Sequence, residues 1–134
     1  GNMKFFVFIL TALLMVPSAA SARQQEAEFV YYGFDPDIVT NYVSGNRRSL
    51  GYVRVTVELM VTDKRFLTAI EHHEPLILDT IIGILSKQTE DKVKSLTGRE
   101  EIRTSILTRL QEVLKKETGD TIIKDLLFTK YLYQ

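Results

Sequence analysis

The most regular pattern of hydrophobic and polar residues lies between residues 52 and 61. Every second position there is valine or leucine, and the positions between them are polar or amphipathic: Val53, Val55, Val57, Leu59 and Val61 alternate with Tyr52, Arg54, Thr56, Glu58 and Met60. Strict alternation predicts a strand with one face in the core. Aromatic and β-branched runs at 28–34 and 38–43 predict two shorter strands, separated by a turn at Asp35-Pro36-Asp37.

Helical spacing follows the long strand. Asp63 is expected to cap a helix over residues 64–73, and Pro75 suits the first turn of a second helix. That second helix is apolar nearly all round, with Leu76, Ile77, Ile81, Ile82, Ile84 and Leu85. We therefore expect it to be covered on all sides rather than to lie on the surface.

A longer helix is predicted to begin near residue 97. Thr97 and Glu100 form a capping-box signal, and apolar residues recur at helical spacing as far as Leu114. Gly119 suits the end of this helix, and residues 121–133 form a last β-favouring run. The order of strands, helices and strand predicts an α+β domain in which two or three helices cover one face of a small, mostly antiparallel sheet.

The first 22 residues have the pattern of a secretory signal peptide. A basic residue precedes the apolar run at 5–16, and small residues up to Ala22 suit a cleavage site. Gly1 and Asn2, ahead of the first methionine, are interpreted as residues added in cloning. The alternative is an uncleaved membrane anchor, but such a run forms a helix of about 18 Å against a hydrocarbon core of roughly 30 Å.

Export by a cleaved signal places the rest of the chain in the periplasm. Residues 23–30 are then a short leader, and residues 31–134 form one domain. The chain has no cysteine, which excludes disulfide scaffolds and cysteine-based zinc sites. Its 17 basic and 17 acidic side chains cancel, so no global field attracts nucleic acid or an anionic membrane, and partners must be selected by shape.

The candidate chemistry is sparse. His72 and His73 could contribute to a zinc or copper site, but neighbouring helical residues point about 100° apart and no third histidine completes the shell. A solvated helix end is favoured for this pair, with protonation-dependent packing as a third interpretation. Arg47 and Arg48 could contact a phosphate or an acidic partner, although a solvated loop is the favoured interpretation.

Other residues have structural interpretations. No nucleophile elbow, phosphate loop or paired-histidine zinc motif is present, so we expect no enzyme activity, no cofactor and no small-molecule substrate. The interleaved charges between residues 90 and 109 indicate a solvent face with ion pairs. The aromatic residues between 29 and 34 are assigned to the sheet and its edge, although tyrosine is also enriched at partner surfaces.

In their joint order, several short motifs resemble the C-terminal domain of the flagellar basal-body-associated FliL family. The resemblance spans roughly residues 31–134 and rests on the segment 34–42, the long strand after Arg48-Ser49-Leu50, and the motifs Glu74-Pro75, Asp79, Ile81-Ile82, Ile84-Leu85-Ser86, Leu96-Thr97-Gly98-Arg99-Glu100, Ile102-Arg103, Leu127-Phe128-Thr129 and Gln134. Helix starts, caps and a strand end account for the matching positions, so we expect structural roles for Asn41, Pro75, Asp79, Gly98, Phe128 and Gln134.

The resemblance implies a fold similar to the stomatin/prohibitin-type (SPFH-like) domain, and no catalysis. It further implies association with flagellar stator proteins of the MotA/MotB type, as a ring that encloses or braces the periplasmic linker of the B subunit and supports torque under load. It assigns no partner-contact residues.

Two features depart from the family pattern. Family members carry an uncleaved membrane helix where this chain shows a cleavable signal, and Tyr42 replaces the usual leucine. The chain is therefore expected to form a homo-oligomer or to join a ring with an anchored FliL. A soluble stomatin-like periplasmic scaffold and a metal or small-ligand binder remain as alternative functions.

Overall fold

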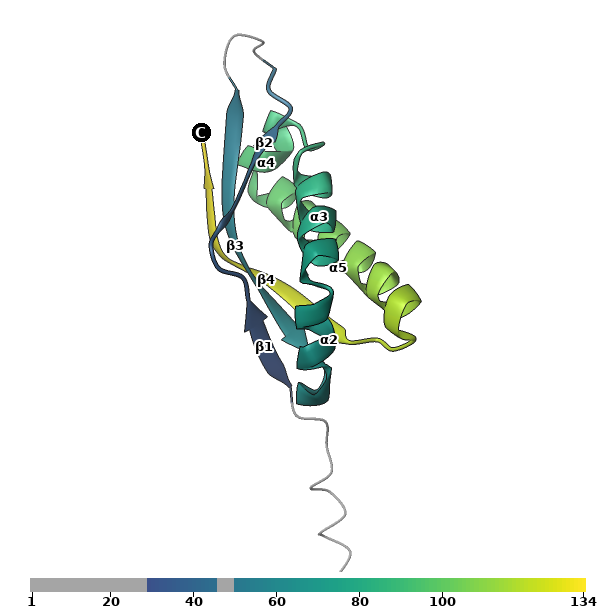
Figure 1. The fold of residues 1–134 in the computed structure, drawn as a ribbon. Helices are drawn as coiled ribbons and strands as arrows, with labels where there is room; N and C mark the ends of the chain where they lie inside the picture. Colours follow the sequence, from purple (N-terminus) through teal and green to yellow (C-terminus); the bar gives the residue numbers. More distant parts are fainter. Residues whose placement is uncertain (1–28, 46–49) are drawn as a thin grey trace, which may run out of the picture.

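The structure is a computed structural model that describes residues 29–45 and 50–134. The signal peptide, most of the leader and the Arg47-Arg48 pair lie outside these residues. The elements follow one another as two short strands, a long strand, a group of helices and a last long strand (Figure 1): β1 (Val30–Gly33), β2 (Ile38–Tyr42), β3 (Gly51–Val61), the 3-10 helix η4 (Lys64–Phe66), α2 (Leu67–His72), α3 (Glu74–Leu85), α4 (Glu90–Lys94), α5 (Leu96–Thr118) and β4 (Ile123–Tyr133).

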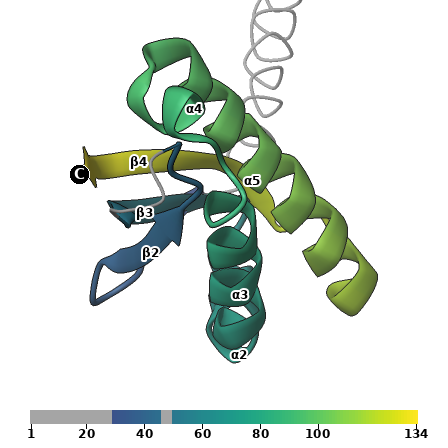
Figure 2. The same cartoon turned by 90° about the horizontal axis from the view of Figure 1, so that it is seen from above.

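The long strand β3 is the centre of an antiparallel sheet. Its first half pairs with β2 and its last part pairs with β1, so these two strands lie end to end along one edge of β3. The strand β4 pairs with β3 along the other edge, with register shifts near Thr56 and Met60. The helices α3 and α5 lie on the same side of this sheet (Figure 2). The α+β architecture with a small antiparallel sheet is therefore confirmed.

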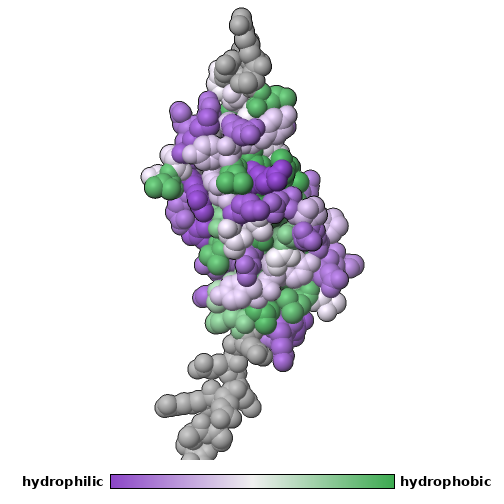
Figure 3. Space-filling view, turned by 90° about the vertical axis from the view of Figure 1, so that its left-hand side faces the viewer, coloured by the Kyte–Doolittle hydropathy of each residue, from purple (hydrophilic) through white to green (hydrophobic). Residues whose placement is uncertain are grey.

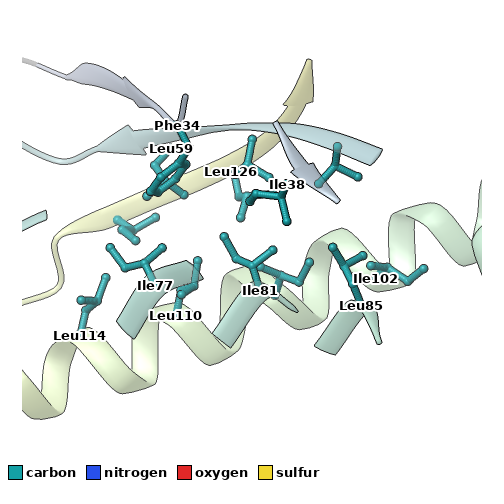
Figure 4. Packing of buried hydrophobic residues seen from close by; sticks show 14 of the residues in the cluster. Phe34, Ile38, Leu59, Ile77, Ile81, Leu85, Ile102, Leu110, Leu114 and Leu126 are labelled. Carbon is teal, nitrogen blue, oxygen red and sulfur yellow. The ribbon is translucent and has the colours of Figure 1, made fainter. Parts of the chain in front are cut away.

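The hydrophobic core lies between β3 and these helices. The five alternating apolar side chains of β3, from Val53 to Val61, are completely buried. They face apolar side chains from α3, α5 and β4, among them Ile77, Ile81, Leu85, Ile102, Leu110, Leu114 and Leu126 (Figure 4). Burial of a leucine or isoleucine side chain contributes about 1.5–3 kcal/mol, so this layer is the main source of stability.

The predicted helix caps were right in two cases and wrong in one. Asp63 accepts a hydrogen bond from the backbone N–H of Arg65 at 3.0 Å, and Gly119 ends α5 with a φ of 80° that glycine adopts without strain. The capping residue of α5 was predicted two positions too late, at Thr97. The capping side chain is Ser95, which accepts from the N–H of Gly98 at 2.9 Å, because its extended backbone directs the hydroxyl into the first turn.

The short helix α4 was not predicted from the sequence. Only Val93 is buried in its five residues, which is too little apolar periodicity to indicate a helix.

The prediction that the second helix is covered on all sides was wrong. In α3, Ile77, Ile81 and Leu85 are buried, but Ile82 is 38% exposed and Leu78 is only partly buried. The reason is geometric: the sheet and α5 pack mainly on one side of α3, so Leu78 and Ile82 stay partly accessible. This bare side of α3 is part of the site described below.

The contact between α4 and α5 requires glycine at position 98. A Cβ atom there would collide with the backbone oxygen of Lys92, which cannot move aside as a flexible side chain can. At Gly83, in the middle of α3, an added Cβ atom would meet no other atom within 4 Å.

We predict that Gly98→Ala lowers the free energy of unfolding by about 1–3 kcal/mol through overpacking. Gly83→Ala is the matched control, and we expect it to raise stability by up to about 1 kcal/mol because alanine favours the helix. Urea unfolding followed by circular dichroism measures both. Equal effects of the two substitutions would contradict the close approach at Gly98.

Candidate interaction surface

A groove of about 250 Å³ lies between the β1–β2 connection and α3. Its apolar lining comes from Phe34, Ile38 and Val39 on the strand side and from Leu78 and Ile82 on α3, the positions that the uncovered side of this helix presents. We call it the β2–α3 groove. Three carboxylates, Asp35, Asp37 and Glu74, also line it, and no lysine or arginine does.

Asp37 fixes the connection that forms one wall of the groove. Its carboxylate accepts from the Thr56 hydroxyl at 2.8 Å and from the Lys130 ammonium at 3.2 Å, which ties the β1–β2 connection to β3 and β4. These two hydrogen bonds lower the pKa of Asp37. The wall is therefore held in place by the sheet beneath it.

Glu74 joins the opposite wall to β1. The hydroxyl of Tyr32 donates to its Oε2 at 2.6 Å. This hydrogen bond, together with burial and the negative charges of Glu74 and Glu71, raises the pKa of Tyr32 to about 12. Glu74 thus holds the first turn of α3 against the sheet.

The sheet face opposite the helices is open. Several large apolar side chains are more than two-fifths exposed on this side, namely Tyr31, Val39, Tyr52, Leu127 and Leu132. A shallow hollow of about 400 Å³ lies there, lined by Val39, Tyr52, Arg54, Leu132, Tyr133 and Gln134. Figure 3 views the side formed by the strands, where hydrophobic patches lie among hydrophilic ones. We call this the open sheet face.

The two histidines lie at the junction of α2 and α3. Their rings meet edge to face with centroids 5.0 Å apart, and His73 is the residue before the first turn of α3. Within residues 29–45 and 50–134, no group of three or more His, Asp or Glu side chains could hold a metal ion. The structure thus brings His72 and His73 together without the additional ligands that a metal site needs.

The six family-motif positions are spread over the whole fold and form no common site. Pro75 lies in the first turn of α3 and Asp79 is exposed further along it, whereas Gly98 is buried where α4 meets α5.

The other three positions lie on the sheet. The side-chain amide of Asn41 donates to the Gly51 carbonyl at 3.3 Å, and the ring of Phe128 lies 5.3 Å from that of Tyr131. Gln134 exchanges backbone hydrogen bonds with Tyr52 at 2.9 and 3.3 Å. These contacts support structural roles, which remain predictions for all six residues.

The polar sides of α4 and α5 form a solvent face with ion pairs, as predicted. Lys92 lies 3.3 Å from Glu101 and Arg109 lies 3.2 Å from Glu112. Arg103 has a different role, because it pairs with Glu100 on its own helix and also reaches the Asp125 carboxylate on β4 at 2.9 Å. Arg103 therefore attaches α5 to the sheet.

Sequence reasoning did not find the β2–α3 groove. The apolar residues around the whole of α3 were a sign of the groove, but we interpreted them as evidence that other parts of the chain cover this helix. Phe34 and Val39 were assigned to the sheet, and nothing in a linear pattern shows that the connection after β1 folds beside α3. Such proximity depends on the tertiary arrangement.

The groove and the open sheet face are thus carried by one α+β domain. The sequence model of the family described as "Flagellar basal body-associated protein FliL" matches residues 31–134, and the chain belongs to this family.

A curated relative, the "Flagellar protein FliL" of Aquifex aeolicus (strain VF5), is 28% identical over 105 residues. The match covers 78% of this chain and 62% of the relative, so the chain spans less than two-thirds of that protein's length. Among the residues that the structure describes, no helix is long and apolar enough to cross a membrane.

We predict that Tyr32 titrates near pH 12, and that Glu74→Gln brings its pKa back towards 10, because the hydrogen bond to the carboxylate is the largest cause of the shift. The raised pKa keeps the phenol protonated in the folded state, so this contribution to stability is complete below pH 10 and is lost as the pH rises through 12.

The measurement is the ultraviolet difference titration between the protein and its Tyr32→Phe variant. Glu71→Gln is the control, since Glu71 acts only through its charge and should shift the curve less. A Tyr32 titration near pH 10 in the unmodified protein would contradict the contact.

Proposed function

We propose that this protein is a non-enzymatic accessory of the flagellar motor that associates with the stator complex in the periplasm, as an oligomeric ring, and supports torque under load. The observation that carries the proposal is the family match over residues 31–134. The partners we propose are stator proteins of the MotA/MotB type, with the periplasmic linker of the B subunit as the segment enclosed by the ring.

The architecture is compatible with this role. The fold is an antiparallel sheet with helices on one side, and we propose that it is related to the stomatin/prohibitin-type domain. Such a domain would act through contacts alone. A ring can shift the stator towards its ion-conducting state only if it makes unequal contacts with the two states.

The open sheet face supports the assembly part of the proposal. Tyr31 and Leu132 on this face are more than half exposed, and tyrosine is enriched at protein contacts. We propose that copies of the chain, or this chain and an anchored FliL, meet through this face. The signal-like segment at 1–22 supports export to the periplasm.

Two alternatives predict other results. A soluble stomatin-like scaffold would use the same surfaces away from the motor, and it would capture envelope proteins other than stator subunits. A metal-binding function rests only on His72 and His73, and no group of three or more His, Asp or Glu side chains that could hold a metal ion is found among the described residues.

We predict that deletion of the gene for this protein, in a strain without a paralogue, leaves swimming normal in dilute medium but lowers the swimming speed in viscous medium. The reason is that the proposed ring acts when the stator bears load. Tracking of single cells across a viscosity series measures this, and restoration by the plasmid-borne gene is the control. Unchanged speed at every viscosity would exclude the motor role.

We predict that a photo-crosslinking residue at Leu132 captures a second copy or the stator B subunit in living cells, since this side chain is 56% exposed on the open sheet face. The same residue at Thr108, on the polar side of α5, is the control and should capture neither. Capture from Thr108 but not from Leu132 would place the assembly on the other side of the molecule.

A further inference from the structure

The strand β2 has an edge without a partner strand in the part of the chain that the structure describes. On β3, Tyr52 exchanges both of its backbone hydrogen bonds with Gln134, so its N–H and C=O point away from β2. Antiparallel strands alternate between pairs that exchange hydrogen bonds and pairs that do not. Asn41, which is opposite Tyr52, and Val39, two residues before it, therefore direct their backbone N–H and C=O groups to the open edge.

Val43, which follows Val39 and Asn41 in this alternation, shows that the open edge of β2 can accept another strand. Val43 donates its N–H to the Gln88 carbonyl at 2.8 Å and accepts from the Glu90 N–H at 3.0 Å, which forms an isolated parallel bridge with Thr89. A short piece of the chain thus already pairs with this edge where β2 ends. The positions at Val39 and Asn41 stay open beside it.

The β2–α3 groove runs along the same part of β2. Ile38 and Val39 line the groove on the strand side, and Leu78 and Ile82 of α3 form the other side. A strand added to β2 would place alternate side chains towards α3, because the side chains of a strand point to opposite faces. Backbone pairing at an edge and pockets for alternate side chains are the two components of peptide recognition by strand addition.

The charge of the groove specifies the peptide further. Asp37 is already paired with Lys130, but no ion pair joins Asp35 or Glu74 to a cation within the described residues. A lysine or arginine beside the apolar side chains would meet these carboxylates. Two copies of this chain joined through their β2 edges would instead bring two negative grooves together, so a second copy is disfavoured at this edge.

The other edge of the sheet is less suited to strand addition. The strand β4 has two register shifts and carries Lys124 and Lys130, and bulges and lysines are features that discourage pairing at an edge. The strand β2 has neither, since its five residues are Ile-Val-Thr-Asn-Tyr in unbroken register with β3.

We propose that the β2 edge and the β2–α3 groove bind an extended segment of a partner protein by strand addition, and that this segment carries alternate apolar side chains next to a lysine or arginine. This inference goes beyond the proposed function, because it concerns the kind of segment bound and holds whichever protein supplies it.

The test is to select peptides that bind the purified protein from a phage-displayed library of short random sequences. The protein is expressed with its own N-terminal segment. We expect enriched sequences with apolar residues at every second position and an adjacent basic residue. Val39→Pro removes the N–H that points to the open edge and leaves the pairing with β3 intact, so it should weaken the best peptide at least about fivefold.

Two further variants separate the groove from the edge. Ile82→Glu should abolish binding by placing a charge among the apolar side chains, and Asp35→Asn should reduce both the affinity and its dependence on salt. Val39→Thr retains the N–H and should therefore lose less affinity than Val39→Pro. Leu96→Glu, which changes a side chain that is 85% exposed elsewhere, should bind normally. Thermal unfolding verifies that each variant is folded.

The outcome decides the proposal without reference to the motor, since the library contains no flagellar sequence. Absence of an enriched pattern would overturn it, as would enrichment of acidic peptides or of apolar residues at helical spacing. Binding that Val39→Pro and Ile82→Glu leave unchanged in folded protein would also overturn it. The proposed motor role would be unaffected by any of these results.

Discussion

The structure depends on the burial of one face of β3. The five alternating apolar side chains from Val53 to Val61 have no exposed surface. The helices α3 and α5 pack on this face of β3, and the strands β1, β2 and β4 pair with the two edges of β3. A shift of register by one residue would expose this whole set and bury Arg54 and Glu58, so the alternation fixes which side of the sheet the helices occupy. The open sheet face is the necessary counterpart of that choice.

The two interaction surfaces arise from an imbalance between apolar composition and covering structure. The helix α3 carries apolar side chains around most of its circumference, yet the sheet and α5 can cover only one side of it. The remaining side chains, Leu78 and Ile82, stay partly accessible beside a strand edge that also lacks a partner in the described chain. The chain thus stabilises its fold with one side of α3 and leaves apolar side chains accessible on the other side, on a helix that tertiary packing already holds in place.

Sequence reasoning identified the elements that have a strong local period or a local cap. The strand around Val57, the cap at Asp63 and the end of α5 at Gly119 all follow from residues close together in the chain, and the order of elements indicated the fold class. It did not find α4, which has one buried residue. It assigned the cap of α5 to Thr97 instead of Ser95, because Thr97 and Glu100 have the spacing of a capping box and lie close to Ser95 in the sequence. The groove was missed because it joins residues 34–39 to residues of α3 that are at least 35 positions later in the chain, and only the tertiary arrangement brings them together.

The end-to-end arrangement of β1 and β2 has a mechanical consequence. Because both strands pair with the same edge of β3 but at different parts of it, they are attached to the sheet independently. Tension applied to the N-terminal side of the domain reaches it first through β1, where four residue pairs with β3 and the hydrogen bond from Tyr32 to Glu74 resist it. Detachment of β1 would leave the pairing of β2 intact and would release the first turn of α3 from its tie to the sheet. The strand β1 can therefore separate from the sheet while the rest of the domain stays folded.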